Sequence, residues 1–442
     1  MGEFEKGRSF LDEQIEVDLL TAGFFGEHEP EAQDWNPSIS GDIDYIIPFD
    51  CLARDIQQWI LSTSPKQQPA LAFASALTAI STCTGRYVKA RGVKGNVMFI
   101  GIAESGDGKD RPLKAVREII NAVRHPQTGH YTQMASGAAL IESVSDTPSL
   151  ALTIDEAGHY LAGIKSKYAS VYAREIMPII TELYTSAGDA YIGKKTKGNS
   201  ALQIIEPHLS FFGLSTESQL MDAVSKSDLE DGSLARFNVF FGIVDPPKNR
   251  GVDFGASNEV PKEIVDRLKS RIPGVYINER DYKSDGLEFT YEYNAAIIGI
   301  EDFFDDLARN CSDNEKAFKP AYKRLAVRSL QMAILIDQCK SVDVLRWCAD
   351  ICHKSTDVFI KKFNHVVSDS NQEAMVKTIE RAIKESGKNG ISKSGMWSKT
   401  RGIPKYMKDS ILADMIESGK VFTKDVRVKG SRKESNHFFW RK

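Results

Sequence analysis

The expected fold follows from one stretch, Asn96-Val-Met-Phe-Ile-Gly-Ile-Ala-Glu-Ser-Gly-Asp-Gly-Lys-Asp110. It starts as a short apolar run, typical of a buried strand, and passes directly into a glycine-rich loop. A helical pattern, RPLKAVREIINAV, follows at once over residues 111–123. Strand, glycine loop and helix in this order are the context of a phosphate-binding loop, because glycines let backbone N–H groups surround a phosphate at a helix N-terminus.

Within this loop, Lys109 is expected to reach the β- and γ-phosphates of ATP. The usual pattern begins with Gly and ends Lys-Ser/Thr, with the hydroxyl on Mg²⁺, whereas Ala103 and Asp110 stand at those two places here. The Asp110 carboxylate can hold Mg²⁺, but it also brings negative charge near the nucleotide. The alternative is a plain glycine-rich turn. The residues expected to bind the nucleotide are Ser105, Gly106, Asp107, Gly108, Lys109, Asp110 and Arg111.

A second motif follows the loop in the sequence. The apolar run Ser149–Ile154 has the character of a buried strand and ends in two acids, Asp155 and Glu156. In P-loop ATPases, one such acid supports Mg²⁺ and the next polarises the attacking water. Apolar runs that end in acids also occur as ordinary strand ends. The position behind a phosphate loop favours Asp155 as a metal ligand, with Asp110, and Glu156 as a catalytic residue.

Two further expected strands carry candidate catalytic side chains. Leu209–Leu214 ends in Ser215 and Thr216, and a hydroxyl beside the acidic strand can orient the hydrolytic water. Arg236 precedes the strand Phe237–Ile243, and an arginine suits neutralisation of transition-state charge, reaching a neighbouring γ-phosphate if subunits form a ring. The alternatives are an unremarkable strand end and a surface ion pair.

The segment Asp189–Ile205 predicts a β-hairpin, because two apolar runs flank a turn of Gly, Lys and Asn. Lys194, Lys195 and Lys197 at its tip could grip a nucleic-acid phosphate backbone without reading sequence. A soluble loop tip, which lysines also favour, is the alternative.

The bulk properties are those of a globular protein of two or three domains, with 442 residues, 42% hydrophobic and 26% charged. Neither a membrane span nor a signal peptide is expected, which predicts a cytoplasmic protein of a bacterial host cytosol. Six scattered cysteines argue against a disulfide framework. Cys348, Cys352 and His353 leave a metal site open, although their helical spacing favours a buried face.

Charge is distributed unevenly along the chain. Residues 1–50 hold two Lys/Arg against 13 Asp/Glu, whereas residues 371–442 hold 17 Lys/Arg against eight Asp/Glu. The basic C-terminal part suggests contact with a polyanion, and a solvated basic surface is the alternative.

Residues 371–442 predict helix, short helix, helix and two strands, the order of a winged helix-turn-helix. Winged helices also serve as protein docking modules. The basic residues expected to meet a nucleic-acid backbone are Lys405, Lys408, Arg432 and Lys433. The expected domains are an acidic flexible tail (1–45), an α/β P-loop ATPase core (46–261), a helical domain (262–370) and the winged helix-turn-helix (371–442).

Taken together, the motifs resemble those of a family of phage and prophage P-loop ATPases with a RecA/AAA+-like core. These are often fused to primase domains and are regarded as replicative helicases. The likeness extends from about Ile47 to the C-terminus and rests on GDGKD, IDEAG, FFGLST and DGSLARF. The resemblance implies that Arg236 is an arginine finger and that Arg324 senses the γ-phosphate within its own subunit. Arg324 is otherwise readable as an exposed arginine of an amphipathic helix.

We therefore expect an ATP- and Mg²⁺-dependent DNA helicase that forms a homo-hexameric ring around single-stranded DNA and serves a phage or mobile element. No fused primase is expected, so priming would fall to a separate primase. The alternatives are a DNA-binding replication initiator or scaffold whose nucleotide is structural, and a defence or signalling ATPase that recruits a partner through its acidic tail.

Overall fold

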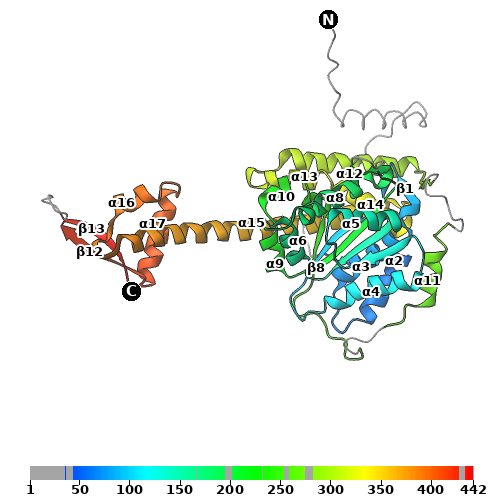
Figure 1. The fold of residues 1–442 in the computed structure, drawn as a ribbon, viewed down its shortest axis with the longest axis horizontal. Helices are drawn as coiled ribbons and strands as arrows, with labels where there is room; N and C mark the ends of the chain where they lie inside the picture. The colour runs from blue at the N-terminus through cyan, green and yellow to red at the C-terminus, as the bar shows by residue number, and fades with distance from the viewer. Residues whose placement is uncertain are drawn as a thin grey trace, which may run out of the picture. The chain divides into compact units, whose positions relative to one another are not determined.

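The computed structural model describes residues 35, 43–166, 168–194, 202–230, 232–252, 258–273, 282–427 and 434–441 (Figure 1). The chain divides into two compact units, Met1–Phe359 and Ile360–Lys442. Four of the lysines and arginines assigned to nucleic-acid binding, and most of the acidic tail 1–45, lie outside the described residues. These four are Lys195, Lys197, Arg432 and Lys433.

A five-stranded, all-parallel sheet forms the centre of the first unit, which is a mixed α/β structure. The strands are β3 (Met98–Ile102), β4 (Thr128–Tyr131), β5 (Ser149–Ile154), β8 (His208–Ser215) and β9 (Asn238–Phe241). Their order across the sheet is β4-β5-β8-β3-β9. Strands β3, β5 and β8 are buried along their whole length, which explains their near-continuous apolar sequences. Because all five strands are parallel, the loops that follow them leave from one edge of the sheet, called here the carboxyl edge.

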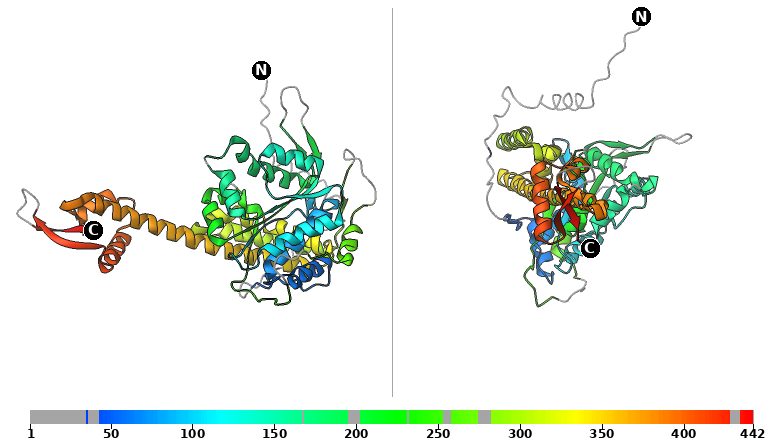
Figure 2. Two further views of the ribbon diagram at one scale, coloured as in Figure 1. Left: turned by 60° about the horizontal axis from the view of Figure 1, so that its bottom comes forward. Right: turned by 90° about the vertical axis from the view of Figure 1, so that its left-hand side faces the viewer.

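Helices cover both faces of this sheet (Figure 2). The helices that pack on its strands are α3 (Pro69–Thr84), α4 (Asp110–Val123), α5 (Gly137–Asp146), α6 (Ala157–Lys165) and α8 (Ile176–Thr185). Helices α2 (Leu52–Ser62), α7 (Val171–Arg174), α9 (Glu217–Ala223) and α10 (Lys226–Glu230) pack mainly on other helices. A Cβ added to Gly101 would meet Leu71 of α3, and one added to Gly213 would meet Ala157 of α6. Gly101 pairs with the residue after Gly213, and successive residues of a strand face opposite ways. Helices α3 and α6 therefore lie on opposite faces.

The predicted hairpin is present as two antiparallel strands at the opposite, amino edge. Its strands are β6 (Ala190–Ile192) and β7 (Gln203–Ile205), and a nearby small sheet holds β1 (Val88–Ala90), β2 (Val93–Lys94) and β10 (Asp285–Gly286). Glu206, directly after β7, is buried and accepts hydrogen bonds from Lys94 at 2.7 Å and Lys89 at 3.0 Å. Burial opposes ionisation of Glu206, but the charges and hydrogen bonds of these lysines, with Ser284, hold the pKa of its carboxyl below the usual range. A buried ion-pair cluster thus anchors the base of the hairpin.

The rest of the first unit is largely helical, as predicted for residues 262–370. It contains α11 (Lys262–Lys269), α12 (Tyr291–Asn310), α13 (Lys319–Tyr322), α14 (Leu325–Asp337) and the beginning of α15 (Val342–Ser386). Trp35 packs edge-on against Phe303 and Phe304 of α12. Cys348 and Cys352 are fully buried in α15, which confirms that they lie on a buried helix face.

The second unit contains the remainder of α15 and a small α/β arrangement. Its elements are β11 (Ile391–Ser392), α16 (Lys393–Lys399), α17 (Lys405–Glu417), β12 (Val421–Arg427) and β13 (Glu434–Trp440). The strands form an antiparallel sheet in the order β11-β13-β12. Its core includes Ile379, Met396, Leu412 and Phe438. The two strands predicted near the C-terminal end of the sequence correspond to β12 and β13.

Two features differ from the sequence expectations. Strand β4 was not predicted, because TGHY has no apolar run and is only partly buried. The expected boundary between residues 370 and 371 is wrong in position, since α15 continues through Asp369-Ser370-Asn371. These three residues cost a helix only some tenths of a kcal/mol each, and neither Gly nor Pro interrupts the segment.

No helix in the described part of the chain combines the length and apolar character needed to cross a membrane.

Candidate functional site

The glycine-rich loop leaves the carboxyl end of β3 and leads into α4. Gly106 and Gly108 have φ angles of +85° and +82°, a region that favours glycine. Asp107, between them, is buried and donates its backbone N–H to the Glu104 carbonyl at 3.1 Å. Lys109 is the last residue before α4, so the free N–H groups of that helix begin at the loop. The loop therefore has the backbone form and the helix N-terminus that an anion requires.

Lys109 lies against the acidic motif that follows β5. Its Nζ donates to Glu156 Oε1 at 3.1 Å, and Lys109 as a whole is only 7% exposed. Glu156 has a φ of +56°, a strained value for a glutamate, and Oε2 has no hydrogen-bond partner within the described residues. Lys109 and Glu156, which the sequence predicted as site residues from two separate motifs, thus lie together in the structure.

Asp155 is exposed and accepts the Glu156 backbone N–H at 3.0 Å. Arg117 of α4 donates to the carbonyl and hydroxyl of Thr153, two residues earlier on β5. Partial burial lowers the pKa of Arg117, and the negative charge of Asp155 opposes this shift. Arg117 thus lies near Asp155 and ties α4 to the end of β5, a role that its sequence context did not indicate.

Ser215 ends β8, the strand between the loop strand and the acidic strand. It pairs with Ile102, and its carbonyl accepts the Ala103 N–H at 3.1 Å, so Ser215 is level with the start of the loop. Its buried Oγ donates to the Thr216 carbonyl at 3.0 Å. The Thr216 hydroxyl caps α9. Of the two candidate hydroxyls, Ser215 is therefore the better placed toward the site.

Two residues that no sequence motif indicated hold the loop. Gln68 is fully buried and donates from Nε2 to the Asp107 carbonyl at 2.9 Å and to the Ile243 carbonyl at 2.8 Å. Lys66 Nζ lies 3.2 Å from Asp107 Oδ1. A Cβ on Gly108 would approach the Lys66 Cβ and carbonyl oxygen to 2.7 Å. Lys66 and Gln68 belong to no phosphate-loop motif, so only a structure could identify them.

Three predicted ligands of the loop have different surroundings. Ser105 and Asp110 are exposed, and Asp110 is the first residue of α4. Arg111 is buried and engaged elsewhere: it donates to Thr63 Oγ1 at 2.9 Å and to Glu118 Oε2 at 2.5 Å. Most of the Arg111 guanidinium is therefore used in hydrogen bonds to α4 and to the residue after α2.

Arg236 and Arg324 do not lie at the loop. Arg236 precedes β9, whose first residue pairs with Phe99, so it stands at the amino edge. It is 9% exposed and donates to the Gly232 carbonyl at 2.8 Å. Burial raises the pKa of Tyr184, while a hydrogen bond to Gln331 and the positive charges of Arg328, Arg324 and Arg236 oppose that shift. Arg324 therefore lies near Arg236, and the expectation that it senses the γ-phosphate within its own subunit does not agree with this position.

Two predicted nucleic-acid contacts are exposed and one is buried. Lys194 of the hairpin is exposed and lies 3.6 Å from Glu175. Lys405 is exposed at the start of α17, with its Nζ 5.2 Å from the Trp397 ring centre. Lys408 is only 6% exposed, so its prediction as a backbone contact is wrong; it lies on the inward face of the same helix.

The residues at the carboxyl edge fit a Mg²⁺-bound triphosphate. Gly106 leaves open space where a side chain would stand, and the partnerless Glu156 Oε2 is available to a further polar group. Within the described ranges, no group of three or more His, Cys, Asp or Glu could hold a metal ion. An Mg²⁺ ion there would therefore have to take part of its ligands from substrate phosphates and water.

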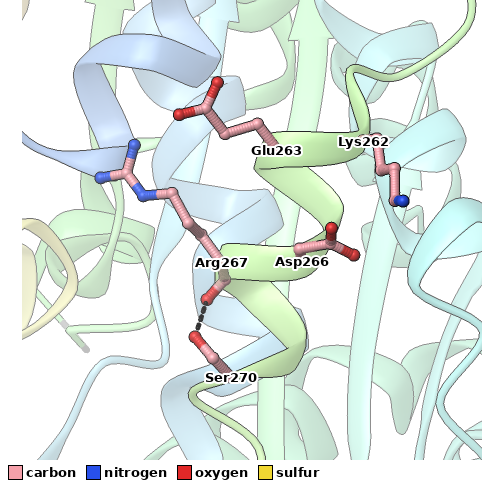
Figure 3. Close-up of a pocket in the computed structure, with 5 residues that line it drawn as sticks. All are labelled: Lys262, Glu263, Asp266, Arg267 and Ser270. Atoms are coloured by element: carbon pink, nitrogen blue, oxygen red, sulfur yellow. Dashed lines mark hydrogen bonds between the residues drawn. The ribbon is translucent and has the colours of Figure 1, made fainter.

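A surface hollow of about 550 Å³ lies along α11 and is separate in its lining from the loop (Figure 3). Four residues of that helix and the residue after it line the hollow: Lys262, Glu263, Asp266, Arg267 and Ser270. Arg267 is paired with Asp55 of α2, and Ser270 Oγ donates to the Arg267 carbonyl at 2.9 Å. None of the residues discussed above lines this hollow.

Comparison with known proteins adds no relative: no family model matches the chain, and no curated protein matches it significantly.

Proposed function

We propose that the protein is a P-loop NTPase that hydrolyses ATP. The observation that carries this proposal is the convergence of Lys109 and Glu156, 3.1 Å apart, beside a loop with two positive-φ glycines. Ser215 ends the strand between them. Lysine, acid and hydroxyl from three separate parts of the sequence thus meet at one edge of a parallel sheet, where open α/β sheets bind their ligands.

The roles follow from the chemistry of each group. The backbone N–H groups of Gly106, Gly108 and Lys109 would hold phosphate oxygens, and the Lys109 ammonium would bind the β- and γ-phosphates. Once Lys109 turns to phosphate, the Glu156 carboxylate loses its only described partner and is free to accept a proton from water. Asp110 and Asp155 would hold Mg²⁺, which neutralises charge on the transferring phosphate.

We further propose that hydrolysis serves movement on DNA, as in a replicative helicase of a phage or mobile element. Support comes from the exposed lysine on the hairpin, from the basic C-terminal unit, and from the family resemblance of the motifs. Helices α16 and α17 and the strands β12 and β13 of the second unit support the proposal of a winged helix-turn-helix, and Lys405 is exposed at the start of α17. Phosphate contacts of this kind give affinity without sequence selectivity.

The test is the rate of ATP hydrolysis by the full chain with and without single-stranded DNA. Wild-type protein should show Mg²⁺-dependent turnover that DNA stimulates, and Glu156→Gln should lower it by at least about 100-fold. Glu142→Gln is the matched control, because Glu142 is an exposed residue of α5. Absence of turnover in the wild type, with DNA present, would refute the motor.

One observation favours a second candidate, an initiator or scaffold whose nucleotide is structural. Asp110 replaces the Mg²⁺-binding hydroxyl and adds a carboxylate at the start of α4. The same assay separates the two candidates, because a scaffold would bind MgATP without turnover. Its bound nucleotide would then be recovered as ATP after incubation with DNA.

A further inference from the structure

The proposed triphosphate site contains more carboxylates than a phosphate-binding loop followed by an acidic strand end requires. Five carboxylates belong to the loop and the acidic motif: Glu104, Asp107, Asp110, Asp155 and Glu156. Lys109 is the only cation of the loop itself and is paired with Glu156. Arg111, directly after the loop, is engaged with Thr63 and Glu118. Mg²⁺ and the nearby Arg117 would offset part of this negative charge, at the Asp155 side of the site. A triphosphate would still meet the Asp107 carboxylate within the loop, where a further cation would favour binding.

Lys66 supplies a cation at this point. Its Nζ lies 3.2 Å from Asp107 Oδ1, and the two side chains are 19% and 12% exposed. Its backbone lies directly against Gly108, so that even a methyl group on Gly108 would meet it at 2.7 Å. Asp107 lies between the two positive-φ glycines whose N–H groups would surround a phosphate. The Lys66 ammonium is therefore already beside the position that a phosphate would take.

The segment that carries Lys66 is held over the loop by specific bonds. Residues 65–68, called here the strap, form a β-bridge from Lys66 to Lys248. The Asn249 N–H donates to the Pro65 carbonyl at 2.8 Å. At the other end, Gln68 donates to the carbonyls of Asp107 and Ile243. The backbone of Lys66 is thus fixed, while its four-carbon side chain can change rotamer.

We propose that Lys66 is a second cation of the triphosphate site, which exchanges Asp107 for a phosphate oxygen when MgATP binds. This inference rests on the proposed nucleotide binding and adds a ligand from outside the loop. A lysine suits such an exchange because its ammonium is a compact charge with three donors on a flexible stem. In the protein without nucleotide, the Lys66 ammonium stays paired with Asp107.

A purely structural role makes a different prediction, and a double-mutant cycle separates the two. If Lys66 only neutralises Asp107, its removal should cost nothing once Asp107 is replaced by Asn. If Lys66 also binds phosphate, its removal weakens nucleotide binding in both backgrounds. The variants are Lys66→Met, Asp107→Asn and the double variant, with Lys248→Met as the matched control for an exposed lysine on the neighbouring segment.

The measurement is the dissociation constant of the full chain for MgATP and MgADP by calorimetry, with thermal unfolding of each variant without nucleotide. We expect Lys66→Met to weaken MgATP binding by about tenfold or more in both backgrounds, the loss of one charge-assisted bond. If Lys66→Met does not fold, Lys66→Arg is measured in its place, and we expect this variant to retain most of the affinity for MgATP. A larger effect on MgATP than on MgADP would assign the contact to the γ-phosphate, and an equal effect to the shared phosphates.

The inference is overturned if Lys66→Met binds MgATP like wild type, or if its defect disappears in the Asp107→Asn background. Either result leaves the proposed function standing, because wild-type binding is measured in the same series. Failure of the wild type to bind MgATP would overturn both proposals.

Discussion

Gly106 and Gly108 provide a test of how the strap holds the phosphate loop. The two residues have nearly equal φ angles, +85° and +82°, so alanine at either place suffers similar backbone strain. Their surroundings differ. Nothing lies within 4 Å of a Cβ built on Gly106, whereas a Cβ on Gly108 meets the Lys66 Cβ and carbonyl oxygen at 2.7 Å. Comparing Gly106→Ala with Gly108→Ala therefore isolates the contact with the strap.

The expected costs follow from the contacts. A non-glycine residue held at positive φ costs about 1–2 kcal/mol, which is the whole expected effect of Gly106→Ala. In Gly108→Ala the strap must also move, because 2.7 Å is too close for a Cβ and a carbonyl oxygen. Moving it breaks the two bonds from Gln68, worth about 1 kcal/mol each. Gly108→Ala should therefore destabilise by about 3–4 kcal/mol.

The assay is thermal unfolding of the full chain without nucleotide, followed by a signal from the first unit. With an unfolding entropy of about 2.1 cal/mol/K per residue over roughly 300 residues, a 2 kcal/mol difference corresponds to about 3 °C between the two variants. Gly92→Ala is the control for strain alone, since Gly92 has a φ of +76° and open surroundings. Equal melting shifts for Gly106→Ala and Gly108→Ala would refute the idea that the strap is fixed against the loop.

Three further predictions follow. Arg236→Ala should leave MgATP affinity of the isolated chain unchanged but lower turnover, because Arg236 lies at the amino edge; a loss of affinity in the monomer, measured by calorimetry, would contradict this. Glu206→Gln should destabilise the fold by about 3 kcal/mol at neutral pH, because it leaves buried lysine charge unpaired. Since folding lowers the pKa of Glu206, its stabilisation is present above about pH 4.3 and is lost as the pH falls through the pKa of the folded state. The difference in free energy of unfolding between wild type and Glu206→Gln should therefore shrink in acid. A difference that stays constant with pH in denaturation curves would count against this role of Glu206. Lys405→Ala should weaken binding to a DNA oligonucleotide without changing the melting temperature, whereas Lys408→Ala should do the reverse; equal effects on DNA binding would contradict their different burial.

The main features of the sheet could be predicted from the sequence, because its central strands are buried on both faces. Such strands appear as apolar runs, and Ser149–Ile154 and Leu209–Leu214 agree with β5 and β8 within a residue or two. Parallel strands also end at a common edge. The order of motifs along the chain was therefore sufficient to bring Lys109 and Glu156 together, without knowledge of the strand order.

The missed residues have a common physical cause. Lys66 and Gln68 contact Asp107 directly from the connection between α2 and α3. That connection is held in place by residues that follow β9, and contacts of this kind leave no periodicity in the sequence. Arg111 is the opposite case, because the structure gives it partners that its place in the sequence did not indicate. Its place beside the loop suggested a phosphate ligand. However, the direction of a side chain depends on its position around the helix, and the Arg111 guanidinium points toward Thr63 and Glu118.

The two edges of the sheet also constrain how Arg236 could act. Strand β9 pairs with β3 from Asn238 opposite Phe99 to Phe241 opposite Ile102. Arg236 lies two residues before this pairing and the loop begins just after it, so at about 3.3 Å per residue they are roughly 20 Å apart. An arginine at that distance can act on a phosphate only across a subunit boundary, with the amino edge of one chain facing the carboxyl edge of the next. That contact is head-to-tail, and head-to-tail contacts close into rings when the rotation permits. Reaching a neighbour would require the guanidinium to leave its present partners, which include the Gly232 carbonyl and the Thr185 hydroxyl, and a phosphate contact would have to offset that loss. A role for Arg236 in hydrolysis therefore implies an oligomer, and a monomer that retains full turnover would exclude that role.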